Sequence, residues 1–223
     1  LRRAWREWIR STLVMVLAVV SVRSAVADWN DVPSGSMKPT ILEGDRIVVN
    51  KLAYDLRMPL TRWRLLHRHD PRPGEIVILF SPEDGTRLVK RVVAGPGDRI
   101  AMSSNRLIIN GRPLTYARAD PLRLPGVDPD RKGRIRATEA LGTVRHEVML
   151  SLSAPAVRSF PEIVVPRGHY FVMGDNRDRS HDSRHFGLVR RDRIVGRAFA
   201  VAASLDPEAS FLPRWSRFFH PLD

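Results

Sequence analysis

The chain has 223 residues, and its 37 lysine and arginine residues outnumber 24 acidic ones, which leaves a formal net charge of +13. The length predicts one domain, or one domain with an insert, and a hydrophobic content of 43% excludes wholesale disorder. Cysteine is absent, which excludes disulfides, thiolate metal ligands and a cysteine nucleophile, while the basic charge indicates an anionic partner, either nucleic acid or an acidic membrane surface.

Residues 1–28 predict a basic N-terminal segment and a transmembrane anchor. Four arginines within the first ten residues precede an uncharged run at residues 11–22. The run is shorter than the ~20 residues that span a bilayer, but it extends to Ala27 if Arg23 reaches the far headgroups. Because the arginines precede the span, the positive-inside rule places the rest of the chain outside the cytoplasm. A cleavable signal peptide ending at Ala27 fits the same residues and stays open as an alternative.

The rest of the chain predicts short strands separated by glycine and proline. Strands are expected at residues 46–50, 75–80, 86–93, 162–165, 169–173 and 197–201. The turn at residues 81–85 and the Asn-Gly pair at 110–111 predict two hairpins. Residues 115–160 are polar and rich in arginine and proline, with weaker periodicity, and they predict an inserted lobe.

These patterns together predict a mostly β fold with one N-terminal transmembrane helix. A β-barrel core is expected at residues 29–111 and 161–223, interrupted by an inserted β lobe at residues 112–160. The C-terminal stretch at 211–219 mixes aromatic side chains with arginine, which indicates either ordinary packing or contact with a membrane surface.

A loop at residues 32–40 places Ser34 and Ser36 on either side of Gly35, between two prolines. Proline holds the chain extended and glycine allows a close approach of the backbone, so such a turn can present one hydroxyl to a substrate. Taken alone, the pattern is typical of an ordinary loop.

Lys90 is one of only four lysines in the chain and lies within a predicted strand. Because side chains alternate across a strand, it shares one face with Leu88 and Val92. Arg87 and Arg91 share the other face, and we expect these arginines to meet solvent while Lys90 turns inward. Burial favours the neutral form of lysine, which can then take a proton from a serine in the Ser–Lys version of nucleophile activation.

The polar segment at residues 173–187 directly follows a predicted strand. One interpretation is a network of Asp–Arg pairs that shapes the loop. His181 and His185 would bind a metal together with Asp182 only on a helix, which the many glycine, aspartate and serine residues disfavour. Two other roles stay open: His181 as the base of a Ser–His–Asp triad, or Ser180 as a hydrogen-bond partner that orients the strand lysine.

Four stretches together resemble the bacterial type I signal peptidases, also called leader peptidases, which are membrane-bound Ser–Lys endopeptidases that remove signal peptides. The matching stretches are residues 33–40, 44–51, 89–98 and 174–184, in the order in which the family carries them. The resemblance extends from the predicted anchor to about Phe199, and it implies the family's β-rich catalytic core with an inserted β domain.

The resemblance also implies a residue for each role in catalysis. Ser36 matches the family nucleophile, and Lys90 matches its general base. The Ser34 hydroxyl matches the group that joins the Ser36 backbone N–H in the oxyanion hole. Ser180 matches the hydroxyl that orients the lysine.

Asp182 and Arg184 match a supporting salt bridge near the site, and the reaction is expected to need no metal and no cofactor. The implied partners are exported preproteins, cleaved after small residues, and the lipid bilayer, but not nucleic acid. The implied location is the bacterial inner (cytoplasmic) membrane, single-pass, with the catalytic domain on the outer, periplasmic side. Two alternatives stay open: a specialised Ser–Lys relative, such as a conjugative-transfer or pilin-processing peptidase, and a membrane-tethered basic binding protein without catalysis.

Overall fold

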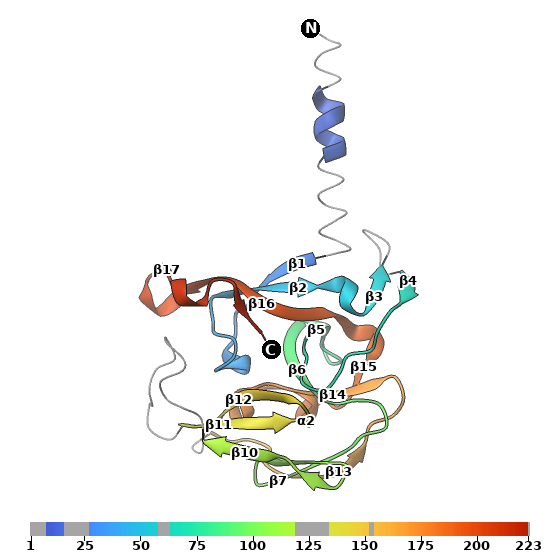
Figure 1. Ribbon diagram of the computed structural model, residues 1–223, viewed down its shortest axis with the longest axis vertical. Coiled ribbons are helices and arrows are strands. Elements are labelled where there is room, and N and C mark those ends of the chain that lie inside the picture. The colour runs from blue at the N-terminus through green and yellow to red at the C-terminus, as the bar shows by residue number, and fades with distance from the viewer. Residues whose placement is uncertain (1–7, 16–26, 58–62, 119–133, 152–153, 223) are drawn as a thin grey trace.

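The computed structural model describes residues 8–15, 27–57, 63–118, 134–151 and 154–222. Half of these residues lie in strands, arranged in one large sheet and three smaller ones (Figure 1). Neighbouring strands in every sheet are antiparallel. The predicted mostly β fold is therefore confirmed.

The large sheet runs in the order β1, β2, β16, β5, β6, β14, β15, and β17 and β18 pair with β16. Its strands are β1 (Ala27–Asp31), β2 (Asp45–Asn50), β5 (Ile76–Phe80), β6 (Arg87–Ala94), β14 (His169–Met173), β15 (Val189–Arg190), β16 (Ile194–Asp206), β17 (Leu212–Pro213) and β18 (His220–Pro221). Five of the six predicted strands lie here. β16 is longer than predicted because it pairs with β2 along one edge and with β5 along the other, and these non-local bonds extend it beyond its apolar stretch.

The path of the large sheet has two ends, β1 and β15, so in the described residues the predicted β-barrel core is an open, curled sheet. The register along β16 shifts at residues 194–196, 198–200 and 201–203. Such bulges bend a strand and increase its twist. The sheet therefore curls without closing, and β5, β6 and β14 lie below β1, β2 and β16 in Figure 1.

The smaller sheets comprise a hairpin, a three-stranded sheet and a four-stranded sheet. Their strands are β3 (Asp55–Arg57) with β4 (Arg64–His67), then β10 (Thr115–Arg118), β11 (Arg134–Leu141) and β12 (Val144–Ser151), then β13 (Phe160–Val164), β7 (Arg99–Ser103), β8 (Arg106–Ile109) and β9 (Arg112–Pro113). The predicted hairpin between β8 and β9 is confirmed. Its turn residues Asn110 and Gly111 have φ angles of 52° and 74°, as a tight hairpin turn requires.

The chain leaves the large sheet before the point predicted for the inserted lobe. β7 and β8 already pair in the four-stranded sheet, so sheet membership changes at Arg99, while the lobe boundaries at 112 and 160 stay predictions. Gly97 N donates to the Val165 carbonyl and Val165 N donates to the Asp98 carbonyl, which holds the two ends of this excursion together. The excursion comprises β7 to β13 and rejoins the large sheet at β14.

Helical structure in the described residues is short. It consists of residues 8–15, α2 (Ser183–Phe186) and the 3-10 turns η1 (Gly35–Met37), η2 (Lys51–Ala53), η3 (Arg177–Arg179), η4 (Arg191–Arg193), η5 (Pro207–Ala209) and η6 (Trp215–Arg217). Residues 1–7 and 16–26 of the predicted anchor lie outside the part of the chain that the structure describes. Within that part, no helix combines the length and the apolar character that crossing a membrane requires.

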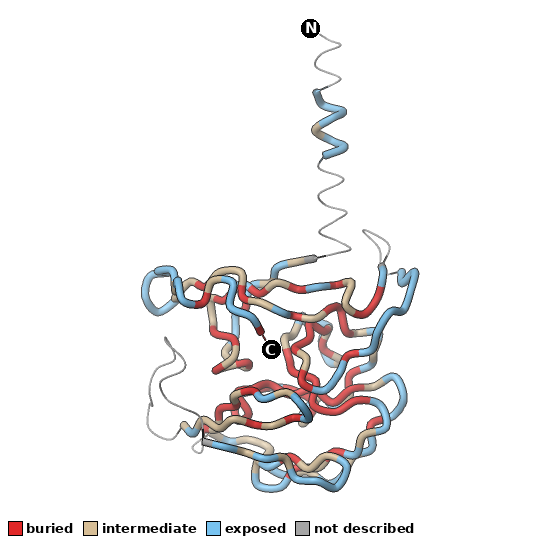
Figure 2. The backbone as a smooth tube through the Cα atoms, in the orientation of Figure 1, coloured by how far each residue is buried: buried red, intermediate tan, exposed pale blue. Residues whose placement is uncertain are grey.

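The core lies on both sides of β6 (Figure 2). Val89 packs against a cluster that includes Met37. Val92 belongs to a second cluster, with Tyr54 and Tyr170. A strand covered on both faces buries every side chain in its centre, and this is what removes Lys90 from water.

Candidate active site

Ser36 lies in η1, a single turn held against the core by the fully buried side chain of Met37. The Lys90 Nζ lies 2.8 Å from the Ser36 Oγ, although the two residues are 54 positions apart in the sequence. The Ser34 Oγ lies 3.4 Å from the Ser36 Oγ. The structure thus brings three of the predicted site residues together around one hydroxyl.

Lys90 is only 2% exposed. Burial lowers the pKa of its ammonium to about 8, because the charged form loses hydration; the carboxylates of Asp182 and Asp175 oppose this shift, and Arg184 supports it. About a tenth of Lys90 is therefore neutral at pH 7, far more than for an exposed lysine. The expectation that Lys90 faces inward is confirmed.

The expectation that Arg91 faces solvent is wrong, whereas Arg87 is exposed as predicted. Arg91 is fully buried and forms two hydrogen bonds of 2.9 Å to the carboxylate of Asp175. It also donates to the Gly74 carbonyl. Alternation along a strand assigns each side chain to one face of the sheet, but it does not show whether other elements cover that face. In this structure, other elements cover both faces of β6.

Asp182 and Arg184 form a bidentate ion pair with two distances of 2.8 Å, and both side chains are fully buried. Asp182 also accepts a hydrogen bond from the backbone N–H of Gly174. Burial alone would raise the pKa of Asp182, but the hydrogen bonds and charge of Arg184 hold it below its usual range. Asp182 is therefore ionised. It holds Gly174, the first residue of the loop, in place, and its negative charge acts to raise the pKa of Lys90.

Ser180 is buried, but its hydroxyl makes no hydrogen bond within the described residues, so the expected bond to Lys90 is not formed in this structure. Ser180 instead packs directly against Gly174. A Cβ added at Gly174 would overlap both the Ser180 hydroxyl and the carbonyl oxygen of Ser36. Residue 174 thus has to be glycine for the loop to lie this close to the turn that carries Ser36.

Asn176 is a site residue that sequence reasoning missed. Its backbone N–H donates to the Ser36 carbonyl at 3.0 Å, and its side-chain amide donates to the Gly35 carbonyl at 2.9 Å. The Gly35 carbonyl and the Ser36 N–H belong to one trans peptide, in which they point in opposite directions. By holding that carbonyl, Asn176 fixes the direction of the Ser36 N–H. Nothing in the local sequence separates this asparagine from an ordinary turn residue.

The three-stranded sheet supports the same loop from the other side, which the sequence did not reveal either. Arg177 makes a buried bidentate pair with Glu139 on β11, with distances of 2.6 and 2.8 Å. Burial alone would raise the pKa of Glu139, but the charge of Arg177 holds it well below its usual range. Met149 N donates to the Asp175 carbonyl at 2.8 Å. The three-stranded sheet, which is part of the excursion from the large sheet, therefore supports the loop that contacts Ser36.

Comparisons with known proteins identify the family of the chain. A model of the family described as signal peptidase, peptidase S26, matches residues 5–203. The chain belongs to this family. It is 37% identical over 225 residues to a signal peptidase I of Pseudomonas fluorescens, a match that covers 95% of this chain and 77% of that protein. A signal peptidase I of Pseudomonas aeruginosa is 36% identical, with the same coverage.

A solved structure of a signal peptidase I from Enterococcus faecalis V583 is 30% identical, covers 58% of this chain and 97% of that chain, and has a TM-score of 0.35. The family and the curated relatives identify the activity. The chain is a serine endopeptidase that cleaves signal peptides, and its substrates are preproteins that carry them.

His181 and His185 make their contacts with groups other than the nucleophile of the peptidase. His181 pairs with the Glu83 carboxylate at 2.8 Å and stacks on His185 with a ring separation of 4.9 Å. The side chain of His181 is 59% exposed, which is not the environment of a base that has to meet a half-buried serine. Lys90, not His181, is the titratable group in contact with Ser36.

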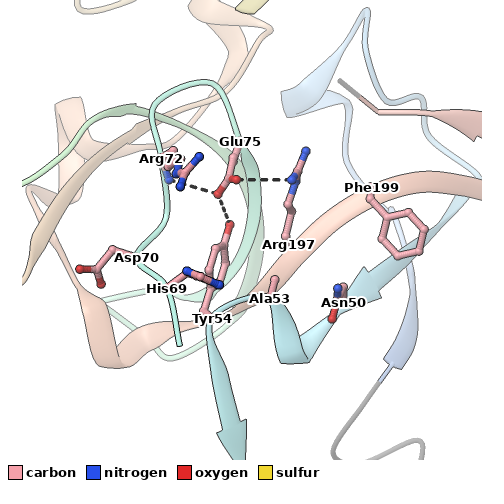
Figure 3. Close-up of a pocket in the computed structure, with 9 residues that line it drawn as sticks. All are labelled: Asn50, Ala53, Tyr54, His69, Asp70, Arg72, Glu75, Arg197 and Phe199. Atoms are coloured by element: carbon pink, nitrogen blue, oxygen red, sulfur yellow. Dashed lines mark hydrogen bonds and ion pairs between the residues drawn. The ribbon is translucent and has the colours of Figure 1, made fainter. Parts of the chain in front are cut away.

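A larger cavity, of about 420 Å³, lies elsewhere in the peptidase, between β16, the segment after β2 and the segment that precedes β5 (Figure 3). Figure 3 shows the Tyr54 hydroxyl and the Arg197 guanidinium pointing at Glu75, at 2.7 and 3.4 Å. This cavity contains none of the residues expected in the active site. Its polar groups partner one another, so its size alone does not make it the place of the chemistry.

Proposed function

We propose that the peptidase cleaves its substrates with Ser36 as nucleophile and Lys90 as general base. The observation that carries this proposal is the 2.8 Å contact between the two side chains in a buried environment that lowers the lysine pKa to about 8. Neutral Lys90 takes the Ser36 proton, and Ser36 Oγ attacks the scissile carbonyl. The Lys90 ammonium then returns the proton to the departing amine, and a water activated by Lys90 hydrolyses the acyl-enzyme.

The developing oxyanion accepts hydrogen bonds from the Ser34 hydroxyl and the Ser36 backbone N–H. Ser34 is within reach of the reaction because its hydroxyl lies 3.4 Å from the Ser36 hydroxyl. Asn176 sets the direction of the backbone donor through the Gly35 carbonyl. Loss of one such donor typically costs ~10²–10³-fold in rate.

Ser180, Asp182 and Arg184 position Lys90. The ion pair between Asp182 and Arg184 is rigid because both side chains are fully buried. Ser180 is buried and, like the Ser36 carbonyl, lies directly against Gly174, and we expect its hydroxyl to orient the lysine when substrate is bound.

The substrate is expected to bind in an extended form beside the segment ahead of Ser36 and beside β6. Main-chain hydrogen bonds hold such a peptide, and its alternate side chains point toward the protein. We expect small residues at two alternating positions before the cleaved bond, where only shallow apolar pockets would receive them.

Substitution of the two proposed catalytic residues tests this assignment. Ser36→Ala and Lys90→Arg should each reduce cleavage of a model preprotein by at least ~10³-fold, because one removes the nucleophile and the other replaces the base with a group that keeps its proton. His181→Ala is the matched control and should stay within ~2-fold of the wild type, since the side chain is exposed. Near wild-type turnover by Lys90→Arg, or loss of turnover in His181→Ala, would overturn the dyad.

We also propose that residues 1–28 anchor the peptidase in the bacterial inner membrane as a single span, with the catalytic part on the periplasmic side. The arginines that precede the apolar run support this orientation. Trp29, Phe199, Trp215 and Phe219 are each at least 44% exposed, which is costly in water and favourable in an interface. β1, which follows the proposed span, lies at the same end of the body as β17 (Figure 1).

A further inference from the structure

A second, smaller cavity opens directly beside the nucleophile. It has a volume of about 160 Å³, and Ser36 forms part of its wall. The other walls come from Lys38 and Glu43 after the nucleophile turn, from Arg134 at the start of β11, and from Arg179 at the end of η3. Segments far apart in the sequence thus converge on one opening at the site of bond cleavage.

The cavity carries two positive charges that nothing in the described residues neutralises. Lys38 and Glu43 form an ion pair of 3.2 Å and cancel each other. The guanidinium groups of Arg134 and Arg179 have no acidic partner within the described part of the chain. Two unpaired guanidinium groups around a small cavity favour an anionic ligand, and a carboxylate matches their planar fork.

Both arginines are carried by well-held backbone. Arg134 faces Ser151 in the antiparallel pairing of β11 with β12. Arg179 ends the turn whose other residues, Arg177 and Asp178, are buried and bonded to the three-stranded sheet. A rigid backbone reduces the conformational entropy lost when these side chains bind a ligand.

The position of the cavity identifies which part of the substrate reaches it. The residues before the cleaved bond are expected between β6 and the segment ahead of Ser36. Ser34 and Gly35 of that segment border the cavity beside the nucleophile, but no residue of β6 lines it, and its remaining walls lie on the other side of Ser36. The opening lies across Ser36, toward β11 and η3. The chain that continues past the scissile bond, which becomes the new N-terminus of the mature protein, is therefore the part that enters.

We propose that this cavity is a subsite for an acidic side chain at the first or second residue after the cleaved bond, bound by Arg134 and Arg179. The inference rests on the proposed Ser36–Lys90 reaction only for the direction in which the substrate lies. It adds a preference within the substrate class of the peptidase, namely preproteins whose mature part begins with aspartate or glutamate at one of these positions.

Matched peptide substrates test the subsite. Two pairs of peptides differ only by Glu or Gln, at the first or at the second residue after the cleaved bond. The full-chain wild type should cleave the Glu peptide of one pair with a kcat/KM about 10-fold higher, the size expected of one charge-assisted hydrogen bond at a partly exposed site. In Arg134→Gln combined with Arg179→Gln, the Glu-to-Gln ratio should fall to about 1.

Two further variants separate the outcomes. Arg145→Gln removes an exposed arginine that does not line the cavity, and its Glu-to-Gln ratio should equal that of the wild type. Arg179→Glu should prefer a peptide with lysine at the same position over the Gln peptide. A wild-type ratio near 1 at both positions, or a preference that survives the double substitution, overturns the subsite. Failure of the Ser36–Lys90 assignment looks different, because it shows in the Ser36→Ala and Lys90→Arg variants and leaves these ratios unchanged.

Discussion

Lys90 is a single amino group held out of water without a carboxylate in direct contact. Its pKa falls from 10.5 to about 8, so the unfolded chain binds the proton more tightly than the folded one. Stability therefore rises as the pH increases from about 8 toward 10.5, and the whole penalty, about 3 kcal/mol at 1.36 kcal/mol per pKa unit, is present below pH 8. The burial that destabilises the folded protein is the same burial that keeps a base available beside Ser36.

The same pKa sets the pH dependence of cleavage. Only the neutral form of Lys90 can accept the Ser36 proton, so kcat/KM should rise about tenfold per pH unit below the pKa and level off above pH 8. The measurement is kcat/KM for a peptide without ionisable side chains, from pH 6 to pH 10. A flat profile across this range would mean that a group other than Lys90 takes the proton.

At this scale, sequence reasoning succeeded for Lys90 and failed for Arg91. Both residues fit the two-residue period of a strand. Only Lys90 could be singled out, because it is the only charged residue on an otherwise apolar face. The burial of Arg91 depends on Asp175, which lies 84 positions away and supplies the partner that makes a buried guanidinium tolerable. No pattern within β6 contains that information.

At the scale of elements, the segment from Gly174 to Arg184 acts as a bridge. One side of it touches the turn that carries Ser36, through Gly174 and Asn176. The other side is bonded to the three-stranded sheet through Arg177. The excursion from the large sheet thus has a mechanical role in the active site, which its polar, weakly periodic sequence did not suggest.

Substitution of Gly174 tests how closely these elements must approach. In Gly174→Ala the new methyl group would overlap the Ser180 hydroxyl and the Ser36 carbonyl, so the loop has to move away from the nucleophile turn. We expect a loss of about 10²-fold in kcat, the effect of a displacement near 1 Å at a reacting group. Steady-state cleavage of a peptide substrate measures it.

Gly95→Ala is the matched control for this substitution. Gly95 is also buried, but a Cβ there would meet its nearest neighbour, the Tyr170 ring, at 3.8 Å, which is an ordinary contact. This variant should keep full activity. Equal activity of the two alanine variants would show that the loop tolerates displacement and that its packing against Ser36 does not position the reaction.

At the scale of the whole molecule, several exposed aromatic side chains lie on or next to the N- and C-terminal strands of the large sheet: Trp29 on β1, Phe199 on β16, Trp215 after β17 and Phe219 before β18. Arg217 is buried and pairs with Asp45 at 2.6 Å, which anchors the C-terminal stretch. Trp215 and Phe219, on either side of it, are 71% and 82% exposed. Of the two interpretations of residues 211–219, ordinary packing accounts for the buried Arg217. The exposure of Trp215 and Phe219 favours contact with a membrane surface.

A comparison of two substrates tests the membrane contact. In the full chain reconstituted in vesicles, Trp215→Ser combined with Phe219→Ser should raise KM for a membrane-bound preprotein several-fold, by ~1–2 kcal/mol of lost interfacial burial. The kcat/KM for a short soluble peptide should not change. Ile135→Ser, which removes a 45% exposed apolar side chain on β11, is the control. A parallel change for both substrates would indicate damage to the active site instead of a lost membrane contact.

The sequence by itself determined the family, most strands of the large sheet and the positions of Ser34, Ser36 and Lys90. These depend on short motifs and on the period of side chains along a strand, which are local properties. Tertiary structure alone decided that the sheet stays open, that Arg91 is buried, and that Asn176 and Glu139 support the site. The physical reason is that burial and hydrogen bonding of buried polar groups depend on what other segments place opposite them, as Asn176 does for the Gly35 carbonyl across 141 residues.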